Sequence, residues 1–81
     1  MLKRLKLFNG CCYCKSQHNK LTIEHLVPIV KGGTNIILNL FGACSKCNSS
    51  KGTKYFLEWY RQQSFYDPIR EYEILQRTYA G

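Results

Sequence analysis

The stretch ACSKCNSSKG at residues 43–52 decides how this chain of 81 residues can fold. Cys44 and Cys47 are separated by two residues, which lets two sulfurs point at one metal ion from a single turn. We expect a short helix over residues 44–51, ended by Gly52 at the position just past its last turn. Asn48 directly follows Cys47 and would lie on this helix.

A second cysteine pair, Cys11 and Cys14, lies upstream in the stretch CCYC. The full pattern C-x2-C-x29-C-x2-C is typical of a tetrahedral zinc site closed by four thiolates. Buried or disulfide-bonded cysteines are the weaker alternative, because five is an odd number and we expect a reducing compartment. Zinc would then supply much of the folding free energy of so small a domain. Cys12 is expected to be a free thiol, and His18 ranks below the cysteines as a ligand.

The overall charge favours a polyanionic partner. Twelve Lys and Arg against five Asp and Glu give a formal charge of +7, which four thiolates and one Zn²⁺ would change to about +5. Neutralised phosphates release counterions, so a basic surface favours nucleic acid, although charge alone is equally compatible with no such role. The sequence has no basic amphipathic helix, long apolar run or signal peptide, so we expect an intracellular protein without membrane association.

The stretch LTIEHLVPIVKGG, at residues 21–33, connects the two cysteine pairs. Its first residues alternate apolar and polar side chains, which predicts a strand over residues 21–25. A loop is expected over residues 26–38, with Pro28, Gly32 and Gly33 as breakers, and a second strand over residues 39–42. Glu24 and His25 end the alternation. Because neighbours on a strand point to opposite faces, both can serve one site only where the strand twists or ends.

Two further helices are expected near the C-terminus, over about residues 54–63 and 68–79. Asp67-Pro68 is a helix start signal, with Asp as N-cap and Pro at the first helical position. We expect one face of the last helix to pack on the domain, and it consists of Ile69, Tyr72, Leu75 and Tyr79. Phe56, Trp59 and Tyr60 are expected in the core. Residues 2–8 are compatible with either a short helix or a strand.

Together these motifs resemble the HNH endonucleases with a ββα-metal fold, in the subtype with a four-cysteine zinc site. The resemblance covers residues 11–52 and leaves the flanks uncovered. It rests on both cysteine pairs and on His25, Asn39 and Asn48 at the spacing H-x13-N-x8-N, a specific combination. The implied fold class is α+β: one small zinc-stapled ββα-metal domain over residues 1–81, with flanking helices.

The resemblance also implies roles for individual residues. His25 would be the general base, Glu24 and Asn48 would bind a catalytic Mg²⁺ or Mn²⁺, and Asn39 would hold the loop and the His25 backbone. Most members have the shorter Asp at the position of Glu24. Elementary chemistry agrees with these roles: a hard cation prefers oxygen ligands, and imidazole, with an ordinary pKa of about 6.5, is a usable base near neutral pH. The zinc, closed by four sulfurs, would be structural.

The implied substrate is DNA, cut or nicked by phosphodiester hydrolysis. Four lysines near the site are candidates for contacts with the DNA backbone: Lys31, Lys46, Lys51 and Lys54. We expect low intrinsic specificity or a partner protein that supplies it, a monomer or homodimer, and by analogy an origin in a phage or mobile element. The alternative function is a non-catalytic zinc module that binds nucleic acid or a protein partner. Such a module would need the cysteines but neither the base nor the hard-metal ligands.

Overall fold

The computed structural model describes residues 8–17 and 20–79. Its elements are β1 (Leu21–His25), η1 (Ile29–Lys31), η2 (Ile37–Asn39), β2 (Leu40–Cys44), α2 (Ser45–Lys51), α3 (Phe56–Tyr60) and α4 (Pro68–Tyr79). The predictions for residues 2–7 and for His18 fall outside the described residues. Within the described ranges, no helix is long and apolar enough to cross a membrane.

The centre of the fold is an antiparallel hairpin followed directly by a helix. β1 pairs with β2 so that Glu24 lies opposite Phe41 and His25 opposite Leu40, and α2 begins at the residue after β2. This is the predicted ββα arrangement, and the α+β fold class is confirmed. The second strand was expected over residues 39–42 but runs from Leu40 to Cys44, because Asn39 still belongs to the 3-10 turn η2.

The loop between the two strands folds back on itself around Gly33. The Gly33 N–H donates to the carbonyl of Pro28 at 2.9 Å. A Cβ atom at Gly33 would lie 1.8 Å from the carbonyl oxygen of Val27, so only glycine permits this close approach. The predicted break at this position therefore marks the point where the loop returns toward the end of β1.

The helix ends follow the predicted signals in two of three cases. α2 ends before Gly52, which has a positive φ of 54°, and the Asp67 carboxylate accepts a hydrogen bond from the Ile69 N–H at 2.9 Å to cap α4. Helix α3 is shorter than the predicted range 54–63. The Gln63 N–H donates to the Tyr60 carbonyl, three residues back, at 3.0 Å, and its side chain donates to the Trp59 carbonyl at 2.8 Å, so the α-helical bonding pattern stops there.

The expected packing face of α4 is wrong for three of its four residues. Ile69 (70%), Tyr72 (63%) and Tyr79 (70%) are mostly exposed, and only the fourth, Leu75, packs partly buried against the core. The helix instead buries Ile74 and directs two arginines at the domain.

The arginines explain this orientation of α4. The Arg70 and Arg77 guanidinium groups donate to the carbonyls of Cys12 and Leu40, both at 2.8 Å. They also lie over the rings of Phe8 and Phe41, at 4.0 and 4.8 Å from the ring centroids. These guanidinium contacts thus take the place of the expected apolar stripe.

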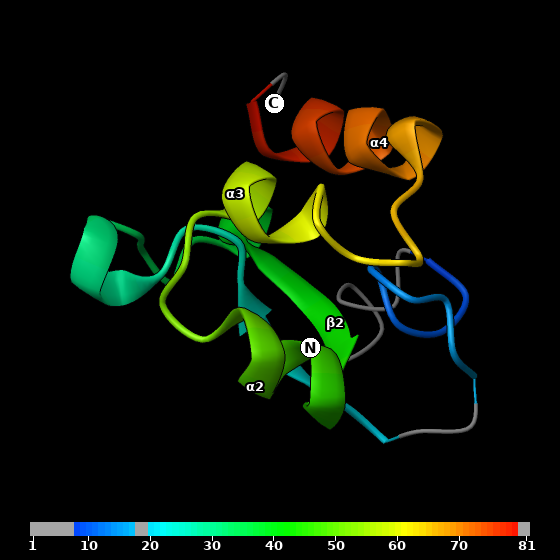
Figure 1. The fold of residues 1–81 in the computed structure, drawn as a ribbon. Helices are drawn as coiled ribbons and strands as arrows, with labels where there is room; N and C mark the ends of the chain where they lie inside the picture. Colours follow the sequence, from blue (N-terminus) through cyan, green and yellow to red (C-terminus); the bar gives the residue numbers. More distant parts are fainter. Residues whose placement is uncertain (1–7, 18–19, 80–81) are drawn as a thin grey trace.

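The core is an aromatic cluster beside the hairpin. Tyr13 packs against Trp59, Phe56 and Tyr60 with centroid distances of 5.0 to 5.9 Å. All four side chains are buried, which confirms the expected core residues of α3. Figure 1 shows α3 between the hairpin and α4, with α2 at the opposite end of the molecule from α4.

Candidate active site and metal centre

The four paired cysteines converge on one point, as their spacing predicts. Their Sγ atoms all lie within 4.8 Å of one another. The Tyr13 N–H donates to Cys11 Sγ at 3.4 Å. The Cys47 N–H donates to Cys44 Sγ at the same distance, so a backbone group supports each pair.

The geometry and electrostatics of this cluster fit zinc. In a tetrahedron with Zn–S bonds of about 2.3 Å the sulfurs lie about 3.8 Å apart, and the Sγ atoms of Cys14 and Cys44 are 3.8 Å apart. Thiol hydrogen bonds from Cys12 and Cys47 lower the pKa of Cys11. The bond to Cys11, together with burial, raises the pKa of Cys47. One thiolate thus opposes ionisation of its neighbours, and a divalent cation would allow all four to ionise.

Cys12 lies outside this set of four. It is 1% exposed, and its backbone N–H donates to the Gly42 carbonyl at 2.9 Å. Burial raises the pKa of Cys12 well above its ordinary value, so the thiol is neutral. The fifth cysteine is therefore a free, buried thiol, as expected.

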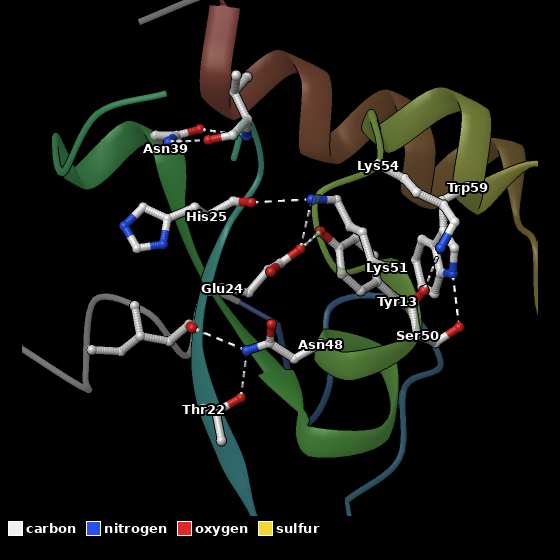
Figure 2. A network of polar contacts seen from close by, with 12 residues as sticks. Tyr13, Thr22, Glu24, His25, Asn39, Asn48, Ser50, Lys51, Lys54 and Trp59 are labelled. Carbon is white, nitrogen blue, oxygen red and sulfur yellow. Dashed lines mark hydrogen bonds and ion pairs between the residues drawn. The ribbon is translucent and has the colours of Figure 1, made fainter. Parts of the chain in front are cut away.

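Glu24 and His25 end β1 and point to opposite sides of it (Figure 2). Glu24 is 3% exposed and faces the interior, whereas the His25 ring lies on the other side. Because this is ordinary strand alternation, the strand alone does not aim both groups at one point.

The Glu24 carboxylate is held inside the domain through one of its two oxygens. Its Oε2 accepts a hydrogen bond from the Tyr13 hydroxyl at 2.6 Å and lies 3.1 Å from Lys51 Nζ. Burial raises the pKa of Glu24, and the Lys51 ammonium opposes that rise. Burial also raises the pKa of Tyr13, which keeps its hydroxyl a hydrogen-bond donor. The second oxygen, Oε1, accepts no hydrogen bond from the part of the chain that the structure describes.

Lys51 does not contact solvent, so its expected contact with DNA is wrong. Its side chain is 0% exposed. Besides Glu24, its Nζ donates to the His25 carbonyl at 3.1 Å. Position 51 lies one turn after Asn48, on the face of α2 that meets the hairpin. The Lys51 side chain is thus paired with a buried carboxylate, as buried basic side chains usually are.

The His25 ring is oriented by Asn35, a loop residue that was not among the predicted site residues. His25 Nε2 lies 2.8 Å from Asn35 Oδ1. Since an amide oxygen only accepts hydrogen bonds, Nε2 carries the proton in this arrangement. In the neutral ring, Nδ1 then holds the lone pair that a general base requires.

Asn48 presents its side-chain oxygen outward from α2. Its Nδ2 donates to Thr22 Oγ1 at 2.9 Å and to the Ile23 carbonyl at 3.1 Å. The Thr22 hydroxyl in turn donates to the Ala43 carbonyl, so it is an acceptor toward Asn48. These partners fix which end of the amide is nitrogen. Asn48 Oδ1 has no protein partner among the described residues and points toward the Glu24 carboxylate (Figure 2).

Asn39 connects the two ends of the loop that follows β1. Its Oδ1 accepts from the Val27 N–H at 2.8 Å, and its Nδ2 donates to the carbonyls of Val27 and Thr34 at 3.1 and 2.8 Å. Its backbone carbonyl accepts from the Leu26 N–H. Asn39 is therefore placed to hold the loop, whereas the carbonyl of His25 itself is held by Lys51.

Comparison with known proteins identifies this arrangement. A family model described as HNH endonuclease matches residues 11–63. The chain belongs to the HNH endonuclease family. Over 71 residues it is also 34% identical to the CRISPR-associated endonuclease Cas9 of Corynebacterium diphtheriae, an alignment covering 84% of the chain and 6% of that protein. The HNH chain thus spans a small fraction of this relative's length. No solved structure matches it.

The residues at this HNH site fit a hard divalent cation. Glu24 Oε1 and Asn48 Oδ1 are both oxygen donors, are both uncommitted within the described residues, and face one another (Figure 2). Mg²⁺ prefers one or two such protein oxygens and fills its other positions with water or phosphate. The donor set therefore suits an oxygen-binding cation, in contrast to the all-sulfur cluster.

The residues that contact the side chains of Glu24 and His25 carry no short-range sequence signal. Tyr13 lies inside the first cysteine turn, and Asn35 follows the glycines of the loop. Neither belongs to a motif with fixed spacing to Glu24 or His25, and only the tertiary fold brings them together. The remaining lysine candidates, Lys31, Lys46 and Lys54, are exposed.

Proposed function

We propose that this HNH chain is a metal-dependent endonuclease that hydrolyses phosphodiester bonds in DNA. The observation that carries the proposal is a set of three atoms around the end of β1 and the facing turn of α2 that have no partner in the described part of the chain. These atoms are the His25 Nδ1 lone pair, Glu24 Oε1 and Asn48 Oδ1. In each of these three side chains, another polar atom is hydrogen-bonded to the protein. The bonded atom fixes the side chain and so preorganises the other atom.

His25 is the proposed general base. Nδ1 takes a proton from a water as its oxygen forms a bond to the scissile phosphorus and the bond to the leaving oxygen breaks. Asn35 keeps the ring in the tautomer that has Nδ1 free, and Lys51 fixes the backbone carbonyl of His25. These contacts support a general base whose ring orientation is fixed.

Glu24 and Asn48 are the proposed ligands of one divalent cation, Mg²⁺ or Mn²⁺. When bound, such a cation acts as a Lewis acid on the phosphate and stabilises the leaving oxygen. The four cysteines are the proposed structural zinc site, which has no open position for substrate.

The proposed substrate contacts are electrostatic and independent of sequence. Lys31, Lys46 and Lys54 are exposed cations of a chain with a formal charge of +7, and such groups bind backbone phosphates without reading bases. Target specificity would then come from a partner protein or from further sequence. The relative that matches this chain carries the corresponding region as 6% of its length.

A supercoiled-plasmid assay tests the proposal. The zinc-loaded protein is incubated with plasmid in EDTA, Mg²⁺, Mn²⁺ or Ni²⁺, and nicked and linear products are resolved on a gel. We expect cleavage with at least one of the divalent cations and none in EDTA. Plasmid binding without cleavage under every condition would favour the non-catalytic zinc module instead.

A further inference from the structure

The Glu24 carboxylate is oriented by two donors that the proposed reaction does not use. The Tyr13 hydroxyl and Lys51 Nζ both contact Oε2, at 2.6 and 3.1 Å, and both side chains are 0% exposed. Because both contacts are made to the same oxygen, the carboxylate cannot rotate without breaking them. Oε1 is thereby left on the side facing Asn48 (Figure 2).

Tyr13 also belongs to the first cysteine turn. It lies between Cys11 and Cys14, and its N–H donates to Cys11 Sγ at 3.4 Å. Its ring is fixed in the aromatic core, 5.0 Å from the centroid of Trp59. The sulfur cluster and the core thus set the position of the hydroxyl that holds Glu24.

We propose that Tyr13 and Lys51 are positioning residues for the catalytic cation, which they serve by fixing Glu24 Oε2 so that Oε1 is presented to the cation. Tyr13 thereby couples the oxygen site to the four-cysteine site. This inference rests on the proposed function. It also gives a reason for Glu, in place of the shorter Asp, at position 24. The additional methylene lets the carboxylate reach the two buried donors and face Asn48 at the same time.

Direct Mn²⁺ binding to the zinc-loaded protein tests the inference through Tyr13→Phe. Free Mn²⁺ is measured by electron paramagnetic resonance during titration. Removing an outer partner of a metal ligand typically costs 10–100-fold in affinity, so we expect the Mn²⁺ Kd to rise about tenfold or more. Zinc content should stay unchanged, and saturating Mn²⁺ should restore most of the cleavage rate. A Tyr13→Phe protein with the parent affinity for Mn²⁺ would overturn the inference.

Tyr60→Phe is the matched control. Tyr60 lies in the same cluster, 5.7 Å from Tyr13 between ring centroids, and its buried hydroxyl has no hydrogen-bond partner among the described residues. The Tyr60→Phe variant loses a phenolic oxygen, as Tyr13→Phe does, but this oxygen does not contact Glu24. Its Mn²⁺ affinity should therefore equal that of the parent. An equal loss in both variants would assign the effect to the core and contradict positioning by Tyr13.

Glu24→Gln separates failure of the inference from failure of the proposed function. If Glu24→Gln binds Mn²⁺ as tightly as the parent, the proposed oxygen site is wrong. If it loses Mn²⁺ and Tyr13→Phe does not, only the positioning role is wrong. In the double variant, Tyr13→Phe should cause no further loss, because it acts through Glu24. If the losses of Mn²⁺ affinity in the two single variants add fully in the double variant, Tyr13 does not act through Glu24.

A measurement on the parent protein covers the case in which Tyr13→Phe does not fold. In protein labelled with ¹³C-tyrosine, Mg²⁺ should shift the phenolic carbon resonance of Tyr13, since the cation draws electron density from the carboxylate that accepts its hydroxyl. The midpoint should match that of Mg²⁺-dependent cleavage. An unchanged Tyr13 resonance at saturating Mg²⁺ would refute the inference.

Discussion

At the scale of single residues, each proposed active-site side chain has one polar atom tied to the fold and another left free. Glu24 commits Oε2 to Tyr13 and Lys51, Asn48 commits Nδ2 to β1, and His25 commits Nε2 to Asn35. These three residues are the ones that the resemblance to HNH endonucleases implied. The sequence could not predict these partners, because Tyr13 and Asn35 approach only through tertiary folding.

Asn35→Ala tests the orientation of the base. Without the amide oxygen, the ring of His25 loses its fixed tautomer and direction, and small misplacements of a reacting group are costly. We expect the nicking rate to fall roughly tenfold or more, with zinc content unchanged. The nitrogen chemical shifts of His25 should change from a single Nε2–H tautomer to a mixture.

Asn35→Asp is the control for this prediction, because it keeps an acceptor oxygen at the same place. It should retain most of the nicking rate and the Nε2–H tautomer. An Asn35→Ala protein that nicks plasmid at the parent rate would show that Asn35 does not orient the base.

At the scale of elements, helix signals predicted where helices lie better than how they pack. Asp67-Pro68 correctly marked the start of α4, but its apolar stripe was assigned to the wrong side. Arg70 and Arg77 find carbonyl acceptors and aromatic rings on the domain. A hydrophobic pattern treats arginine as solvent-facing, so it cannot predict this docking.

Glu71→Gln tests how α4 is attached to the end of α3. Glu71 accepts two hydrogen bonds from Arg61, at 2.8 and 3.0 Å, and one from the Tyr66 hydroxyl. The Arg61 hydrogen bonds lower the pKa of Glu71 below its ordinary value of 4.5, so the carboxylate is ionised at neutral pH. Because Arg61 is 56% exposed, we expect a loss of only about 1 kcal/mol in unfolding free energy.

Urea unfolding of the zinc-loaded protein measures this loss at low salt and in 1 M NaCl, where it should shrink. Glu73→Gln is the control on the same helix, since Glu73 is 50% exposed and, within residues 8–17 and 20–79, pairs only with Arg70 one turn away. It should change stability by less than about 0.5 kcal/mol. Equal stability of Glu71→Gln and the parent would contradict the attachment.

At the scale of the whole molecule, the four-cysteine cluster joins the N-terminal turn to the hairpin and α2. Its spacing predicted it fully, because two C-x2-C pairs constrain the fold more strongly than any local propensity. The buried Glu24–Lys51 pair was not predicted, since the motif pattern treats Lys51 as one of several surface cations. Lys51 is buried because it lies on the face of α2 that the hairpin covers.

Cys44→Ser tests the dependence of the fold on this cluster. Structural zinc contributes about 10–16 kcal/mol in zinc-finger peptides, which exceeds the usual stability of a small domain. We expect the variant to lose zinc, native circular dichroism and dispersed NMR signals. Cys12→Ala, outside the cluster, should keep one zinc per chain. A well-folded, zinc-free Cys44→Ser protein would refute the structural role.

The most direct test of the central claim compares His25→Ala with the parent in the supercoiled-plasmid assay, with Mg²⁺ or Mn²⁺ present. Both proteins are first shown to hold equal zinc and to unfold at similar urea concentrations, because the His25 ring is not part of the core. The proposed mechanism predicts that His25→Ala folds and binds zinc but does not cut. Cleavage by His25→Ala at the parent rate would contradict the assignment of His25 as the base.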